Sequence, residues 1–107
     1  LNCEPAGTYN SYWMVTAVLE AQLGITKEWL LEALAAKGID SRPIFYPLSS
    51  LPAYAGLATA QQARSRNSTS YHLSPYGINL PSALSLSHSQ VQYVCQILQA
   101  IVGNHAG

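Results

Sequence analysis

Residues 26–46, which read TKEWLLEALAAKGIDSRPIFY, decide how the chain is interpreted, because a helix pattern changes to a strand pattern within them. Thr26 carries a hydroxyl that can cap the free amides of a helix start, and Gly38 is a typical helix stop. Leucine and alanine recur at helical spacing between the two. The segment from Ile39 to Tyr46 then predicts a strand. Pro43 inside it favours an edge or irregular position, because proline cannot donate to a sheet ladder.

The flanking segments extend this pattern on both sides. Tyr12–Leu19 is rich in aromatic and β-branched residues, which predicts a strand buried on both faces. Residues 47–66 form a connector, in which Ala58–Arg64 is predicted as one short helix. Residues 67–77 fit neither a helix nor a strand clearly, and residues 78–81 predict a short extended piece.

A terminal helix is the clearest element. Ser87 and Gln90 form a capping box, in which serine and glutamine satisfy each other's backbone amides. The apolar positions that follow share one helix face, and they are Val91, Val94, Cys95, Leu98, Ile101 and Val102. Gly103 is expected to end the helix, and Cys95 to act as a small hydrophobe. Together the elements predict a single α+β domain over residues 1–107, with a small sheet backed by helices.

Charge is scarce in the chain and unevenly placed. Charged residues make up 9% of the sequence, against about 25% in an ordinary soluble domain. Asp40 is the last acidic residue and Arg66 the last basic one, so residues 67–107 carry no formal charge. Such a stretch indicates a surface that lies against another domain or subunit, and it predicts self-association of the isolated chain. A polar surface of serine, glutamine and asparagine is the alternative. Zero net charge gives no sign of a nucleic-acid or anionic-membrane partner.

Location and processing leave few signals in the sequence. No apolar run approaches the roughly 20 residues of a membrane span. Cys3 and Cys95 lack metal-type spacing and give no disulfide framework, so a reduced, cytoplasmic protein is expected. The chain begins at Leu1 without a signal core, which suggests a piece of a longer protein or one that has lost its start.

Four stretches, taken in order, resemble one enzyme family. They are NSYWM at 10–14, KGIDSRPIFYPL at 37–48, SSLPAY at 49–54, and GINLPS at 77–82 with LS at 86–87. Through them the chain resembles, collinearly from about residue 10 to residue 102, the C-terminal small domain of the DegT/DnrJ/EryC1/StrS family of aminotransferases. Within that family the resemblance is to perosamine-synthase-like enzymes.

This resemblance implies a fold, an activity and partners. The small domain of such pyridoxal-phosphate enzymes, like that of aspartate-aminotransferase-type proteins, is α+β and closes over the cleft of a cofactor-binding large domain. The enzymes are dimers that transfer an amino group, typically from glutamate, to a nucleotide-linked keto-sugar for polysaccharide or antibiotic synthesis. The chain is then expected to be inactive alone, and to need the large domain, a second subunit and the nucleotide sugar as partners. A stand-alone ligand-binding or oligomerisation module is the alternative.

Arg42 and Tyr46 are the candidate substrate-binding residues. A guanidinium grips a carboxylate or phosphate with paired hydrogen bonds, and the resemblance places Arg42 in a loop that approaches the active-site cleft. Pairing with Asp40 is the structural alternative for Arg42, and simple packing is the alternative for Tyr46. Ser49 stands where many relatives carry histidine, which puts a histidine-dependent role there in doubt.

No catalytic, cofactor-binding or metal-binding residue is predicted in this chain. Pyridoxal phosphate needs a reactive lysine, whereas Lys27 and Lys37 are both expected to be solvated at the two ends of one helix. In the family that the chain resembles, the cofactor lysine belongs to the large domain. Arg64 and Arg66 are expected at a solvated helix end, with an anion site as the alternative. The three histidines are too far apart in sequence to suggest a metal cluster.

Overall fold

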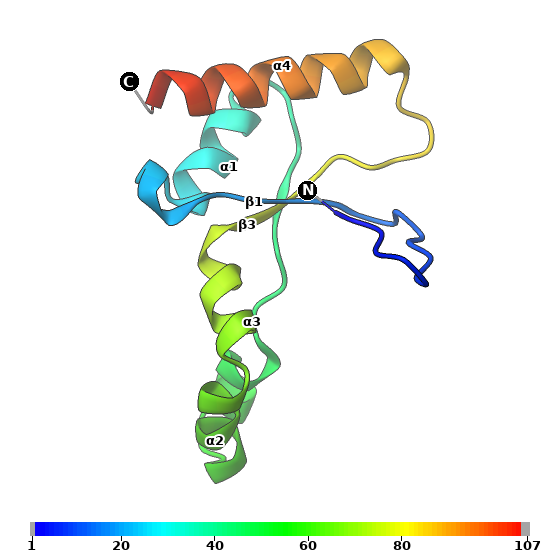
Figure 1. Cartoon of the computed structure of the whole chain (residues 1–107). Coiled ribbons are helices and arrows are strands. Elements are labelled where there is room, and N and C mark those ends of the chain that lie inside the picture. Colours follow the sequence, from blue (N-terminus) through cyan, green and yellow to red (C-terminus); the bar gives the residue numbers. More distant parts are fainter. Residues whose placement is uncertain (1, 106–107) are drawn as a thin grey trace.

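A three-stranded antiparallel sheet forms the centre of the domain. The computed structural model describes residues 2–105 (Figure 1). The strands are β1 (Val15–Val18), β2 (Arg42–Pro43) and β3 (Gly77–Leu80), and β3 lies between the other two. Ala17 and Pro43 both lie opposite Ile78 in this register. The α+β class predicted from the sequence is therefore confirmed.

The helix α1 (Lys27–Ala35) begins and ends where its sequence predicts. The Thr26 hydroxyl accepts a hydrogen bond from the Trp29 amide at 3.2 Å, which satisfies one free donor of the first turn. Gly38 has a φ of 75°, the left-handed conformation that commonly closes a helix. Local sequence alone is enough to fix this element.

Two helices cover one face of the sheet and build a small core. Figure 1 shows α1 and α4 (His88–His105) on the same side of the strands. The buried apolar residues are Ile25, Leu30, Leu34, Ile39 and Ile78. The helix α4 packs half-buried side chains against them, and these are Val94, Ile97, Leu98, Ile101 and Val102. The core is therefore concentrated between α1, α4 and the middle strand.

Both predicted strands are shorter than expected. Tyr12 has a φ of 51°, outside the β region, and Trp13 is 70% exposed, so β1 starts only after them. No residue of β1 is fully buried. The prediction of burial on both faces is wrong, because β1 is an edge strand of a sheet that α1 and α4 cover on one side. β2 consists of Arg42–Pro43 alone, although the Ile44 amide still donates to the Gly77 carbonyl at 2.9 Å.

The helix α4 confirms the capping box and corrects its predicted end. The Ser87 amide donates to Gln90 Oε1 at 2.8 Å, and the Gln90 amide donates to Ser87 Oγ at 3.3 Å. The helix continues past Gly103 to His105. A glycine inside a helix costs only about 1 kcal/mol, and Val102 and Ile101 still pack on the core at this end.

Two residues of the predicted apolar face of α4 do not reach the core. Val91 is 45% exposed, and Cys95 is exposed as well. Both line an open groove beside the loop that precedes the helix, together with Leu80 and Leu86. The prediction that Cys95 packs as a small core hydrophobe is therefore wrong.

Residues 47–76, here called the arm, project from the sheet on the side away from α4 (Figure 1). The arm contains α2 (Ala58–Arg66), α3 (Ser68–Leu73) and single turns at Leu48–Ser50, Pro52–Tyr54 and Ser74–Tyr76. The short helix predicted from residue 58 is confirmed, two residues longer than expected. The radius of gyration is 16.0 Å, against about 13 Å for a compact domain of this length. The arm thus extends the molecule and adds little to its core.

Candidate functional site

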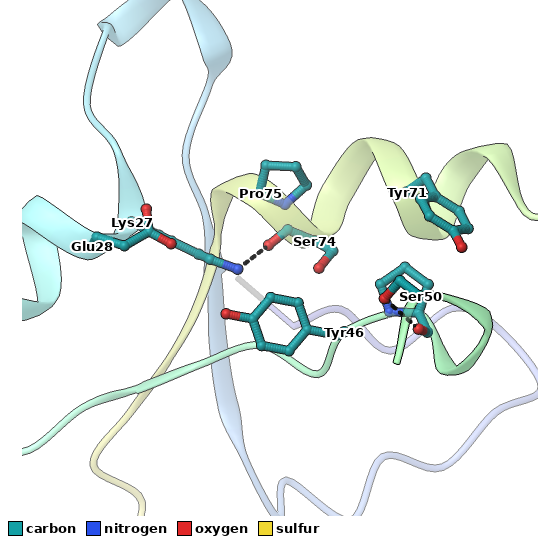
Figure 2. A pocket seen from close by; sticks show the side chains of 8 residues that line it. Lys27, Glu28, Tyr46, Ser50, Tyr71, Ser74 and Pro75 are labelled. Atoms are coloured by element: carbon teal, nitrogen blue, oxygen red, sulfur yellow. Dashed lines mark hydrogen bonds between the residues drawn. The ribbon is translucent and has the colours of Figure 1, made fainter. Parts of the chain in front are cut away.

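Lys27 occupies the point where the arm meets the core. It is the first residue of α1, yet it is only 4% exposed. Its Nζ donates a hydrogen bond to the Ser74 carbonyl at 3.0 Å and lies 4.2 Å from the centre of the Tyr46 ring (Figure 2). The expectation that Lys27 is solvated is wrong, because the first turn of α1 points this side chain between the two ends of the arm.

A pocket of about 320 Å³, here called the Lys27 pocket, opens at this junction. Its lining comes from α1 and from both ends of the arm, and consists of Lys27, Glu28, Tyr46, Pro47, Ser50, Tyr71, Ser74 and Pro75. Figure 2 shows the Lys27 ammonium, the Tyr46 ring and the Ser74 backbone converging at one end of the pocket. Tyr46 is 51% exposed, so part of its ring is open to a ligand.

Tyr71 organises the other end of the same region. Its hydroxyl and Ser49 Oγ lie 2.9 Å apart in a hydrogen bond. The Arg64 guanidinium lies 5.2 Å from the centre of the Tyr71 ring. Ser49 is thus engaged by an aromatic hydroxyl of the arm. Arg64 is exposed in the last turn of α2, as the sequence predicts, and its guanidinium also lies over the Tyr71 ring.

Arg42 lies apart from this pocket. Side chains alternate along a strand, so Asn79 points away from the face on which Ile78 meets the helices. Arg42 pairs with Asn79 across the ladder and shares that second face. Thr16 completes the row, because its Oγ1 donates to Asn79 Oδ1 at 2.7 Å. Polar side chains from all three strands therefore cross the sheet on the face opposite the core.

The Arg42 guanidinium forms an ion pair with Asp40 at 3.1 Å. The two side chains are 76% and 79% exposed, and such a pair is worth only about 0–1 kcal/mol in water. The pairing with Asp40, which was the structural alternative for Arg42, is thus present, and it contributes little stability. The structure does not bring Arg42 and Tyr46 into one pocket.

The remaining candidates lie outside the Lys27 pocket. Lys37 is exposed, and its carbonyl accepts a hydrogen bond from the Tyr93 hydroxyl at 3.0 Å. Arg66 is exposed at the end of α2. Within residues 2–105, no three histidine, cysteine, aspartate or glutamate side chains gather as a metal site. Across the same residues, no helix is both long and apolar enough to cross a bilayer.

Sequence reasoning missed Lys27 and Tyr71 as members of a common region. One signal was present, because a cation in the first turn of a helix opposes the helix dipole and needs some other favourable contact. Tyr71 lay in a segment without a clear pattern, and nothing local to it indicated that it would face Ser49.

The sheet, the helices on one of its faces and the projecting arm define an α+β domain, with a polar row on the face opposite the core and a pocket where the arm meets the core. The family model of the DegT/DnrJ/EryC1/StrS aminotransferases matches residues 2–99. The chain belongs to this family, which confirms the resemblance drawn from its sequence.

Curated relatives agree with this assignment. A GDP-perosamine synthase of Vibrio cholerae is 35% identical over 96 residues, which cover 90% of this chain and 25% of the relative. A GDP-perosamine synthase of Escherichia coli O157:H7 is 34% identical over 93 residues, covering 87% of this chain and 23% of the relative. A GDP-perosamine synthase of Caulobacter vibrioides is 31% identical over 91 residues, which cover 85% of this chain and 23% of the relative. The chain thus spans about a quarter of the length of these relatives.

Proposed function

We propose that the chain serves as the small domain of a pyridoxal-phosphate-dependent aminotransferase that acts on a GDP-linked keto-sugar. The family match over residues 2–99 carries this proposal, together with relatives that are GDP-perosamine synthases about four times as long. The amino group enters from a donor such as glutamate, and the small domain closes over the cleft in which the sugar nucleotide lies.

The exposed surface supports a role against a larger partner. A monomeric domain seldom exposes many large apolar side chains together. Here Trp13 is 70% exposed just before β1, Phe45 is 69% exposed just after β2, and Leu48 is 73% exposed at the start of the arm. A large domain and a second subunit that pack on these residues would remove them from water. Most of the exposed large apolar residues precede residue 58. The surface that a partner would cover therefore extends beyond residues 67–107, the uncharged stretch from which a partner was first inferred.

Arg42 and Tyr46 have separate tasks in this proposal. The exposed guanidinium of Arg42 exchanges its weak pairing with Asp40 for a phosphate or carboxylate, which binds more strongly because two parallel hydrogen bonds form. The half-exposed ring of Tyr46 contacts the substrate from the mouth of the Lys27 pocket. Domain closure brings both to the same ligand.

The residues of this chain do not fit pyridoxal phosphate, and we infer that the cofactor is held by the large domain. The cofactor requires a lysine whose amine is accessible and is also tuned to react by its surroundings. The Lys27 amine is buried and bonded to the Ser74 carbonyl, and Lys37 lies exposed at the opposite end of α1. The chain alone therefore performs no transamination, and its contribution is to bind and orient the sugar nucleotide.

A domain exchange tests the proposed function. Residues 2–99 replace the matching segment of the Vibrio cholerae GDP-perosamine synthase, and the hybrid is assayed for GDP-perosamine formation. We expect activity from the hybrid and none from the 107-residue chain. Arg42→Ala in the hybrid should raise KM for the sugar nucleotide about tenfold, as loss of one charged hydrogen-bonding group does. Arg66→Ala is the matched control and should change neither constant. A folded hybrid that binds the cofactor but forms no product would refute the proposal.

A further inference from the structure

We propose that Lys27 is a positioning residue, whose buried ammonium holds the Tyr46 ring and locks the arm to the core. The role of Tyr46 toward substrate rests on the proposed function; the role of Lys27 toward Tyr46 rests on the structure alone.

The ammonium joins three segments that are distant in sequence. Lys27 starts α1, which is fixed in the core by Leu30 and Leu34, both with no exposed surface. Tyr46 is the last residue before the arm begins, and Ser74 is near the point where the arm ends. A single side chain therefore bridges the rigid helix to both ends of the arm, as Figure 2 shows.

The contacts of Lys27 depend on one another. A buried ammonium must be compensated by hydrogen bonds or by charge. Among residues 2–105, the structure pairs Arg42 with Asp40 and gives Lys27 no carboxylate partner. Its compensation consists of the Ser74 carbonyl and the face of the Tyr46 ring, an electrostatic contact that strengthens when water is excluded. If either end of the arm moves, the ammonium loses one of these two contacts while it stays buried. The resulting free-energy cost opposes the movement.

Few other contacts restrain the arm where it leaves the sheet. The Ile44 amide donates to the Gly77 carbonyl at 2.9 Å, and the Leu19 amide donates to the Tyr76 carbonyl at 3.0 Å. Both bonds continue the strand pairing at the start of β3, and neither involves the Tyr46 ring. The ring is held in place by the ammonium above it. Because the same ring borders the pocket, Lys27 sets the shape of the surface that a ligand meets.

Hydrogen exchange of the 107-residue chain tests this role directly. Lys27→Met keeps the length of the side chain and removes its charge, and Lys37→Met makes the same change at the exposed end of α1. We expect amide exchange in residues 58–73 to become about tenfold faster in Lys27→Met, while α1 and α4 stay within about twofold, because only the arm is released. Lys37→Met should leave all segments unchanged. Lys27→Arg should restore slow exchange, since a guanidinium can also donate to a carbonyl and stack on a ring.

Two further measurements test the Lys27 lock, and the first of them covers the case in which Lys27→Met does not fold. Tyr46→Leu removes the ring and retains the lysine, and it should also speed exchange in residues 58–73. The ring resonances of Tyr46, assigned by comparison with Tyr46→Phe, should shift in Lys27→Met and return in Lys27→Arg. Unchanged arm exchange in Tyr46→Leu, or uniform acceleration in all helices of folded Lys27→Met, would overturn the proposal.

The active hybrid separates this inference from the proposed function. Lys27→Met in the hybrid should raise KM for the sugar nucleotide about fivefold with kcat within twofold, and Lys27→Arg should return KM to the parent value. A fall in kcat as large as the expected rise in KM, which Lys27→Arg does not reverse, would contradict a positioning role. An inactive hybrid whose arm still loosens on Lys27→Met would refute the proposed function and leave the Lys27 lock standing.

Discussion

Replacing Gly77 by alanine should destabilise the domain by forcing two strands apart. Gly77 opens β3, and a methyl group there would lie 2.5 Å from Ile44 Cγ2 and 2.9 Å from Ile44 Cβ. Atoms of these types do not approach so closely. Rotation of the Ile44 side chain moves Cγ2 away, but Cβ is fixed by the backbone, so the strand itself must shift. That shift weakens the 2.9 Å hydrogen bond from the Ile44 amide to the Gly77 carbonyl.

We expect Gly77→Ala to cost about 1–3 kcal/mol, the usual range for overpacking a well-filled site. This is a large share of the about 5–15 kcal/mol by which a domain is stable. Gly103→Ala is the control, because a methyl group there meets nothing within 4 Å and α4 is helical at this position. Alanine favours a helix over glycine by about 1 kcal/mol, so this variant should gain up to that amount. Glycine to alanine should thus lower the stability of the domain at position 77 and raise it at position 103.

Urea unfolding followed by far-UV circular dichroism measures both variants. The midpoint should fall for Gly77→Ala and rise for Gly103→Ala, with unchanged slopes. Ile44→Ala combined with Gly77→Ala removes Cγ2 and Cδ1 but keeps Cβ, so the double variant should recover part of the loss relative to the two single changes. A midpoint for Gly77→Ala equal to or above that of the parent would refute the close packing of Ile44 on Gly77.

Three further predictions concern the core, the cofactor and association. Leu34→Ala should cost about 2–5 kcal/mol in the same unfolding assay, because Leu34 is fully buried. Leu98→Ala should cost less, because Leu98 is half-buried, and Leu84→Ala, at a fully exposed site, should change stability by under about 0.5 kcal/mol. Equal losses of stability in all three variants would contradict the assigned core. Pyridoxal phosphate mixed with the chain should give no absorbance band that survives desalting, because the Lys27 amine is buried and bonded and the exposed Lys37 amine is solvated. A stoichiometric band would contradict this. The chain should self-associate at roughly tens of micromolar in sedimentation experiments, because it exposes large apolar side chains at zero net charge, and a monomer at about millimolar concentration would contradict that expectation.

Local patterns in the sequence determined α1, the start of α4 and the family. Thr26 and Gly38 bracket α1 as expected, and Ser87 with Gln90 forms the capping box, because each of these contacts joins residues close in the chain. The strings around Arg42 identified the family before any three-dimensional information, since a run of specific residues carries more information than hydrophobic periodicity.

The tertiary structure alone decided how much of each element is buried and what meets at the arm. β1 kept its expected place but is half exposed, because the number of helices that cover a sheet does not follow from one strand. The Cys95 side chain lies in a groove instead of the core, because helical spacing shows which residues share a face of α4 but not how the helix is rotated about its axis relative to the core. Lys27 is the clearest case. Its partners are 19 residues away at Tyr46 and 47 residues away at Ser74, so a residue that local rules place in solvent becomes a buried contact only when the arm folds back beside it.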